Sequence, residues 1–266
     1  MPHLDRFPIG LMSMALIIPL ATAATPAPAG AGAAKPTVVL VHGAFAESSS
    51  WDGVVSRLLA EGYPVVAVAN PLRGVKSDAG YVAGVLKSIK GPIVLGGHSY
   101  GGSVITNAAD GNRNVKALVY VAAFAPETGE SAIALTGRFP GSTLAPTLAP
   151  PVSLPSGGKD LYISQNRFPA QFAADVPAGQ AKVMAATQRP VTEAALNEPS
   201  GAPAWKTIPS WFVFGERDRN IPPAAHSFMA KRAGAKETVE VKGASHVVMI
   251  SHPAKVADLI DNAAGT

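Results

Sequence analysis

A serine lies in a short glycine-bounded segment between an expected strand and an expected helix. This arrangement restricts the fold more than any other feature of the chain. The segment is Gly97-His-Ser-Tyr-Gly101, followed by another glycine. The apolar run Pro92-Ile-Val-Leu95 before it is typical of a strand, and residues 101–109 after it are expected to form a helix. A strand that turns at once into a helix must pass through one residue with positive φ, which we expect to be Ser99.

The same turn predicts what Ser99 can do. Glycines at positions 97 and 101 leave room around the turn, where larger side chains would clash. Ser99 would then project from the carboxyl edge of a sheet, with its hydroxyl at a helix N-terminus whose dipole favours developing negative charge. This placement is typical of a serine nucleophile.

Runs that predict strands alternate with runs that predict helices along most of the chain. The expected strands are residues 37–42, 64–68, 92–95, 116–121, 210–214 and 238–241. Helices are expected at residues 51–60, 79–89 and 101–109 and after Pro253. This alternation predicts an α/β fold, in which a parallel sheet is covered by helices on both faces.

The alternation is interrupted after residue 125 and resumes at Ser210. Eleven of the 24 prolines lie between Pro126 and Pro203, among short helical segments such as residues 178–188 and 191–196. We therefore expect a small helical cap insertion at about residues 126–207, over one end of the sheet. The cap would belong to a single domain that spans residues 37–266.

The N-terminus has the pattern of an export signal. Arg6 precedes an apolar run from Ile9 to Leu20, which is shorter than the roughly 20 residues that a membrane span needs. Ala21-Thr-Ala23 fits a signal-peptidase site. Asp5 departs from the usual positive start, and an uncleaved anchor or a buried helix is the alternative. We expect residues 1–23 to be a signal peptide and 24–36 an Ala/Pro/Gly linker. The mature protein would be secreted or periplasmic, without stable membrane insertion.

Composition excludes several classes of function. The chain has no cysteine, so disulfides, thiolate metal sites and a cysteine nucleophile are impossible. Its formal net charge is +4, but the basic residues are scattered and only 6% of the residues are aromatic. A nucleic-acid partner is therefore not expected.

Two backbone N–H groups are expected to face the carbonyl oxygen that a serine nucleophile attacks. One belongs to Tyr100, directly after the serine. The other should come from the turn after the first strand, where Gly43 allows close approach of the backbone. We assign it to Ala44, with Phe45 as the alternative, and we expect His42 to brace this turn rather than to react.

The general base should be a histidine, and His246 fits best among the six in the chain. It lies in a loop just past the last expected strand, on the edge where the serine is expected. His252, which precedes Pro253 at a helix start, is the alternative. The other histidines lie in the signal, in the turn after the first strand, beside the serine and in a helical run: His3, His42, His98 and His226.

A carboxylate should follow the preceding strand and orient the catalytic histidine. Asp218 is expected at the apex of that loop, since Gly215 turns the chain and Asn220-Ile-Pro-Pro223 begins the next helix. Glu216 and Glu127 are the alternatives.

The order Ser99, Asp218, His246 and the segments around these residues resemble the α/β-hydrolase superfamily. The segments are Val-Leu-Val-His42-Gly-Ala-Phe, Gly97-His-Ser-Tyr-Gly-Gly102, Gly215-Glu-Arg-Asp218-Arg-Asn-Ile-Pro, and Ser245-His246 with Pro253. The chain is similar to the compact esterase/methylesterase and hydroxynitrile-lyase branch. This resemblance implies an α/β-hydrolase fold with a mainly parallel sheet of about six strands and no cofactor or metal. It also implies hydrolysis of a carboxylic ester through an acyl-serine intermediate.

The expected cap contains apolar side chains that could line an acyl pocket over the serine or only pack the cap onto the sheet. They are Leu161, Tyr162, Phe168, Phe172, Met184 and Trp205. We predict Phe45, Tyr162, Phe168 and Trp205 as substrate-binding residues. The expected partner is a small to medium, largely apolar ester.

Two other interpretations are a lyase or other non-hydrolytic enzyme on the same fold, and a non-catalytic binding protein. Hydroxynitrile lyases of this branch carry a lysine directly after the catalytic histidine, whereas Val247 occupies that position here. A binding protein would be expected to lack a residue of the triad, and none is missing. Ester hydrolysis is therefore the favoured interpretation.

Overall fold

The computed structural model describes residues 34–265. The predicted signal peptide, residues 1–23, and all but the last three residues of the predicted linker lie outside the described residues and stay predictions. Within the described range, no helix is both long enough and apolar enough to cross a membrane.

Six parallel strands form one sheet in the order β2-β1-β3-β4-β8-β9. This finding confirms the predicted parallel sheet of an α/β-hydrolase fold. The strands are β1 (Thr37–Val41), β2 (Val65–Val68), β3 (Ile93–His98), β4 (Val115–Val121), β8 (Ser210–Gly215) and β9 (Glu237–Val241).

The burial of the strands follows their place in the sheet. Every residue of the inner strands β3 and β8 is buried, because helices cover both faces. The outer strands β2 and β9 alternate between more and less exposed side chains. Continuous apolar runs therefore occupy the centre, and the mixed run Glu237–Val241 lies at an edge.

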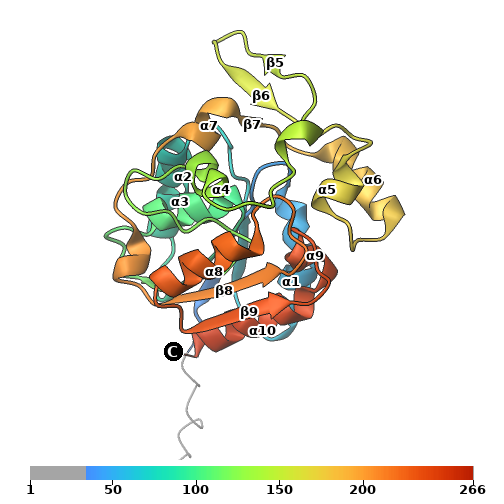
Figure 1. The fold of residues 1–266 in the computed structure, drawn as a ribbon. Helices are drawn as coiled ribbons and strands as arrows, with labels where there is room; N and C mark the ends of the chain where they lie inside the picture. Colours follow the sequence, from blue (N-terminus) through green and yellow to red (C-terminus); the bar gives the residue numbers. More distant parts are fainter. Residues whose placement is uncertain (1–33, 266) are drawn as a thin grey trace, which may run out of the picture. The chain divides into compact units, whose positions relative to one another are not determined.

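Helices cover both faces of this sheet. α1 packs against α10, and α2 packs against α3. Figure 1 shows α8 and α10 on opposite sides of β8 and β9. The bounds are α1 (Asp52–Ala60), α2 (Val75–Ser88), α3 (Tyr100–Ala108), α8 (Pro223–Arg232), α9 (Val248–Ser251) and α10 (Pro253–Ala264).

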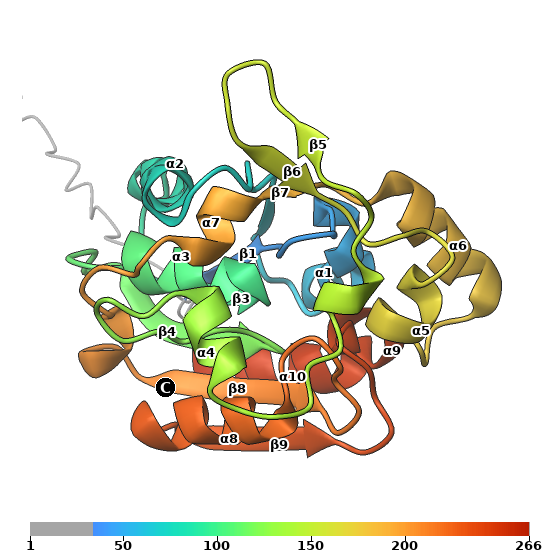
Figure 2. The ribbon, with the colours of Figure 1, turned by 45° about the horizontal axis from the view of Figure 1, so that its top comes forward.

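The segment between β4 and β8 contains more than the expected short helices. Its helices are α4 (Ala132–Gly137), α5 (Phe168–Phe172), α6 (Ala178–Thr187) and α7 (Glu193–Asn197). It also forms a small antiparallel sheet of β5 (Val152–Ser153), β6 (Lys159–Leu161) and β7 (Val191–Thr192), which the sequence did not predict. These strands have two or three residues, too few for a recognisable pattern. Figure 2 shows the β5–β6 hairpin projecting from the rest of the domain.

Hydrogen bonds and ion pairs attach this segment to the loops that follow β1 and β2. Arg73 binds Asp160 of β6 at 2.6 Å and donates to the carbonyl of Pro190 at 2.9 Å. Arg189 binds Glu47 at 3.0 Å. Since these loops lie at the carboxyl ends of the strands, the contacts hold the segment over the edge where catalytic residues were predicted.

Candidate active site

Ser99 lies between β3 and α3 with φ 52° and ψ −123°, the positive φ that the sequence predicts. The glycines around it are needed because the backbone is crowded. A Cβ at Gly97 would lie 2.7 Å from the carbonyl oxygen of Gly101, and a Cβ at Gly101 would lie 2.5 Å from that of Val41. The turn therefore presents the serine side chain at the end of the strand.

The turn after β1 approaches this serine closely. A Cβ at Gly43 would lie 2.6 Å from the Ser99 Cβ. The N–H of Phe45 donates to the carbonyl of Arg189 at 3.0 Å and is therefore occupied. The N–H of Ala44 has no hydrogen-bond partner among residues 34–265, and that of Tyr100 begins α3, where no intrahelical acceptor exists. Of the two predicted alternatives, the geometry thus favours Ala44.

His42 braces this turn, as expected. Its Nε2 accepts a hydrogen bond from the Asn70 N–H at 3.0 Å, so Nδ1 carries the proton and donates to the Gly43 carbonyl at 3.0 Å. Burial lowers the pKa of His42. The ring is therefore a neutral structural element.

Asp218 and His246 meet where the loops after β8 and β9 pack together. The Asp218 Oδ2 lies 2.7 Å from the His246 Nδ1, and both side chains are buried. The loops can pack so closely because Gly215 has no side chain: a Cβ there would lie 2.3 Å from the Ala244 carbonyl oxygen. The predicted carboxylate and histidine are thus in direct contact.

The Asp218 carboxylate is ionised although it is buried. Burial would raise its pKa, but the nearby His246 and hydrogen bonds from His226 and His246 lower it below the ordinary range. Backbone N–H groups of Asn220 and Ile221 also donate to Oδ1, at 2.8 and 3.0 Å. A charged carboxylate can only accept, so the ring nitrogens facing it are donors.

The sequence analysis did not predict that His226 contacts Asp218. The His226 Nε2 lies 3.0 Å from the same Asp218 Oδ2, and its ring stacks on Phe214. The sequence places His226 only in a helical run, because periodicity does not reveal what the first turn of a helix faces. The one available indication is that this helix begins directly after the Asp218 loop.

The alternative acids and base have other partners. Glu216 accepts from the Gly243 N–H at 2.8 Å, and Glu127 pairs with Lys206 at 2.7 Å. His252 lies beside Ser251, with 2.9 Å between its Nδ1 and the hydroxyl oxygen, and 3.6 Å from Asp175. None of the three side chains forms a hydrogen bond or ion pair with Ser99 or Asp218 within the described part of the chain.

A cavity of about 620 Å³ lies over Ser99 and His246. Ala44, Phe45 and Tyr100 line it, and the segment between β4 and β8 supplies many of the other lining residues. Most of these side chains are apolar, including Phe124, Ala132, Ile133, Phe139, Leu144, Leu148, Leu161, Phe172, Leu196 and Ile221. No cluster of His, Asp and Glu that could hold a metal ion occurs in residues 34–265.

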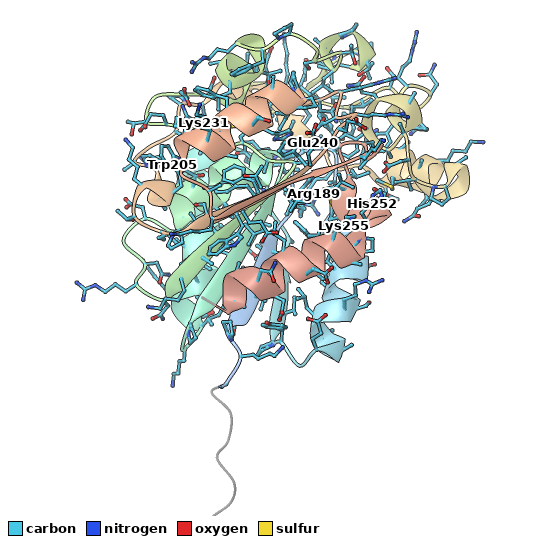
Figure 3. All side chains as sticks on the ribbon, turned by 60° about the horizontal axis from the view of Figure 1, so that its bottom comes forward. Arg189, Trp205, Lys231, Glu240, His252 and Lys255 are labelled. Atoms are coloured by element: carbon cyan, nitrogen blue, oxygen red, sulfur yellow. The ribbon has the colours of Figure 1, made fainter. Side chains whose placement is uncertain are left out.

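Three predicted substrate-binding residues, Tyr162, Phe168 and Trp205, are not in this wall. Trp205 donates through Nε1 to the Pro126 carbonyl at 2.9 Å. It lies on the side of the molecule that carries Lys231, away from His252 (Figure 3). Phe168 is fully buried and packs behind Phe172, with 4.8 Å between ring centroids. Phe168 therefore supports Phe172, which lines the cavity together with Phe45 and Leu161.

Met184 and Tyr162 lie elsewhere. Met184 faces a smaller cavity between α6 and the loop after β1. Tyr162 is partly exposed, and its carbonyl accepts from the Ala149 N–H at 2.8 Å. Of the six apolar side chains considered from the cap sequence, Leu161 and Phe172 reach the cavity over Ser99.

Asn220 is a polar wall residue that the sequence analysis did not assign to the cavity. Gln171 Nε2 donates both to the Arg219 carbonyl and to the Asn220 Oδ1, each at 2.9 Å. The backbone carbonyl fixes the orientation of the Gln171 amide, and this in turn fixes that of Asn220. Its Nδ2 is buried and has no protein partner among the described residues.

Most of the sequence matches a family profile and a fungal protein. The profile described as "Alpha/beta hydrolase family" matches residues 38–259. The alpha/beta hydrolase nvfD of Aspergillus novofumigatus is 29% identical over 255 residues, covering 87% of this chain and 97% of that protein.

Solved structures share the fold at lower identity. Polyneuridine aldehyde esterase superposes with a TM-score of 0.73 at 18% identity, covering 86% of this chain and 98% of that one. A pyrethroid hydrolase from Sphingobium faniae JZ-2 superposes with a TM-score of 0.69 at 22% identity, covering 87% and 98%. With the family profile spanning nearly all of the described domain, this chain belongs to the alpha/beta hydrolase family.

Proposed function

We propose that the protein is a serine esterase that hydrolyses small to medium, largely apolar carboxylic esters. The observation that carries this proposal is the arrangement of three residues. Ser99 and His246 line one apolar cavity, and the His246 Nδ1 is held at 2.7 Å by buried Asp218. A neutral imidazole with a proton on Nδ1 has its acceptor lone pair on Nε2, which can take the proton of the serine hydroxyl.

In the first half of the proposed reaction, the Ser99 Oγ attacks the ester carbonyl carbon while His246 Nε2 takes the hydroxyl proton. The carbonyl π bond opens and its oxygen becomes an oxyanion. The N–H groups of Ala44 and Tyr100 stabilise that charge, and Asp218 stabilises the imidazolium. Among the described residues, Ser99 and His246 make no hydrogen bond with each other, and such contacts often tighten only when substrate binds.

In the second half, the oxyanion re-forms the carbonyl and the bond to the alcohol oxygen breaks. His246 gives its proton to the leaving alkoxide. A water molecule then attacks the acyl-serine carbonyl carbon while His246 accepts one proton from it. When this second intermediate collapses, the bond to the Ser99 Oγ breaks, His246 returns its proton to that oxygen, and the carboxylic acid is released. No other reactant is required.

The chemistry of the cavity supports an uncharged substrate. Its wall is mainly apolar, and the carboxylate among its lining residues, Glu193, is an exposed residue. The residue directly after His246 is the fully buried Val247. An apolar side chain, and not an ammonium group, therefore occupies the position of the hydroxynitrile-lyase lysine. The name of one protein of similar fold, polyneuridine aldehyde esterase, agrees with ester chemistry, and that of another, pyrethroid hydrolase, agrees with hydrolysis.

A panel of p-nitrophenyl esters tests this function. We expect hydrolysis of acetate through octanoate esters by residues 24–266, with an initial burst of p-nitrophenol where deacylation is slow. The p-nitrophenyl hemisuccinate ester, with a carboxylate at the acyl end, should have a kcat/KM at least about tenfold lower than the butyrate ester, because an apolar wall disfavours charge. Hydrolysis of none of these esters by folded protein would contradict the proposal, and equal hydrolysis of the charged ester would contradict the substrate class.

A further inference from the structure

One oxygen of Asp218 accepts hydrogen bonds from two histidines. The Asp218 Oδ2 lies 2.7 Å from the His246 Nδ1 and 3.0 Å from the His226 Nε2. The carboxylate is ionised, so both nitrogens donate. The Asp218–His246 pair proposed above therefore has a third member, which lies on helix α8.

His226 is held rigidly in this position. It lies in the first turn of α8, which begins at Pro223, and only 1% of its surface is exposed. Its ring stacks on Phe214, with 4.8 Å between centroids and 17° between planes. Phe214 lies in β8, the strand whose loop carries Asp218. The donor and its acceptor are thus fixed to the same strand end.

The Asp218 carboxylate is fully committed to donors. Oδ1 accepts from the backbone N–H groups of Asn220 and Ile221, and Oδ2 accepts from the two imidazoles. Each donor stabilises the negative charge of Asp218 independently of His246. The interaction between Asp218 and the His246 imidazolium therefore adds less stabilisation than it would with a carboxylate that had fewer donors. Two of these four donors are backbone N–H groups, and a third belongs to the catalytic His246. The His226 donor can therefore be removed by replacing a side chain that does not itself react.

We propose that His226 is a positioning residue for the esterase reaction: its donation to the Oδ2 that also holds His246 fixes the carboxylate and limits how strongly Asp218 stabilises the His246 imidazolium. The role in catalysis rests on the proposed function. The consequence is that removing the His226 donor strengthens the interaction between Asp218 and the His246 imidazolium.

None of the other titratable groups near His246 forms a hydrogen bond or ion pair with His226 among the described residues. The His98 ring lies 4.8 Å from the His246 ring, and burial keeps its pKa well below the ordinary value. Behind it lies His42, whose pKa is also lowered by burial. On the other side, Asp175 accepts from the Ser245 hydroxyl at 2.5 Å and faces His252 at 3.6 Å. Differences between variants at position 226 therefore report on the shared oxygen.

Two substitutions separate the hydrogen bond from the shape of the side chain. His226→Phe keeps a flat ring against Phe214 but has no N–H donor, and His226→Leu is a second donor-free variant should the phenylalanine not fit. His226→Gln keeps an N–H donor at a reach similar to that of the histidine Nε2. Circular dichroism and thermal unfolding establish that each variant is folded.

The test is an NMR titration of the His246 ring in the Ser99→Ala background, compared among the three side chains at position 226. We expect the donor-free variant to raise the pKa of His246 by about half a unit to one unit, and the glutamine variant to stay within about 0.3 units of histidine. Equal values in all variants, or a glutamine shift as large as that of phenylalanine, would overturn the proposal.

The same variants with Ser99 intact give the kinetic counterpart. The acid limb of kcat/KM against pH should move to higher pH by the same amount in His226→Phe, whereas a merely structural role would lower the plateau without moving the limb. The titration requires no turnover. A failure of ester hydrolysis would therefore refute the proposed function, and a failure of the titration would refute the role of His226.

Discussion

Replacing Ser99 by alanine is expected to lower kcat/KM for a p-nitrophenyl ester by about 10⁴-fold or more, because the nucleophilic oxygen is lost. The fold should be unaffected. Alanine has the same Cβ as serine, so the strained backbone at φ 52° and the close approach to Gly43 are unchanged. Initial rates of ester hydrolysis, measured beside thermal unfolding, provide the check.

Ser103→Ala is the matched control for this experiment. Ser103 lies one turn further along α3, is buried, and its hydroxyl has no hydrogen-bond partner among the described residues. Its replacement should leave kcat/KM within about twofold. A folded Ser99→Ala protein that keeps most of its esterase activity would rule out Ser99 as the nucleophile.

Replacing Asp218 by asparagine is expected to lower kcat by about 10³- to 10⁴-fold. Two imidazoles and two backbone N–H groups donate to this carboxylate. An amide accepts at only one of its two positions, so its NH₂ group must face at least one donor. If that donor is His246, the ring takes the wrong tautomer, and in any case the imidazolium loses its counter-charge. The steady-state kcat and the melting temperature should both fall.

Glu216→Gln is the control for the loss of a carboxylate from the same loop. Glu216 is exposed and accepts from the Gly243 N–H, which a glutamine oxygen can replace. Its activity should remain near that of the unmodified protein. If Asp218→Asn retained activity within tenfold, another group would have to orient His246.

The parts of the molecule that follow from local sequence were predictable. Continuous apolar runs predicted the buried strands β1, β3 and β4, since a strand covered on both faces has few polar positions. The segment around Ser99 was predictable because a strand-to-helix turn permits few residue types. Asp218 and His246 could be placed at one edge because parallel strands end together.

The parts that depend on contacts between distant segments were not predictable. Whether Ala44 or Phe45 has a free N–H depends on the Arg189 carbonyl, which lies more than a hundred residues further along the chain. The side chains that form the cavity wall depend on how the segment between β4 and β8 folds. Trp205 donates to the Pro126 carbonyl and does not line the cavity. His226 contacts Asp218 only because α8 packs against β8.

Covalent capture of the nucleophile tests the central claim most directly. A p-nitrophenyl alkylphosphonate ester reacts with an activated serine and leaves a stable phosphonyl group on its oxygen, which peptide mass spectrometry can locate. We predict one phosphonyl group per protein, on Ser99 in the peptide that contains Gly97-His-Ser-Tyr-Gly101. It should be absent from Ser99→Ala and slowed in Asp218→Asn. Labelling at another residue, or ester turnover that continues with Ser99 unlabelled after full exposure to the phosphonate, would contradict the proposed mechanism.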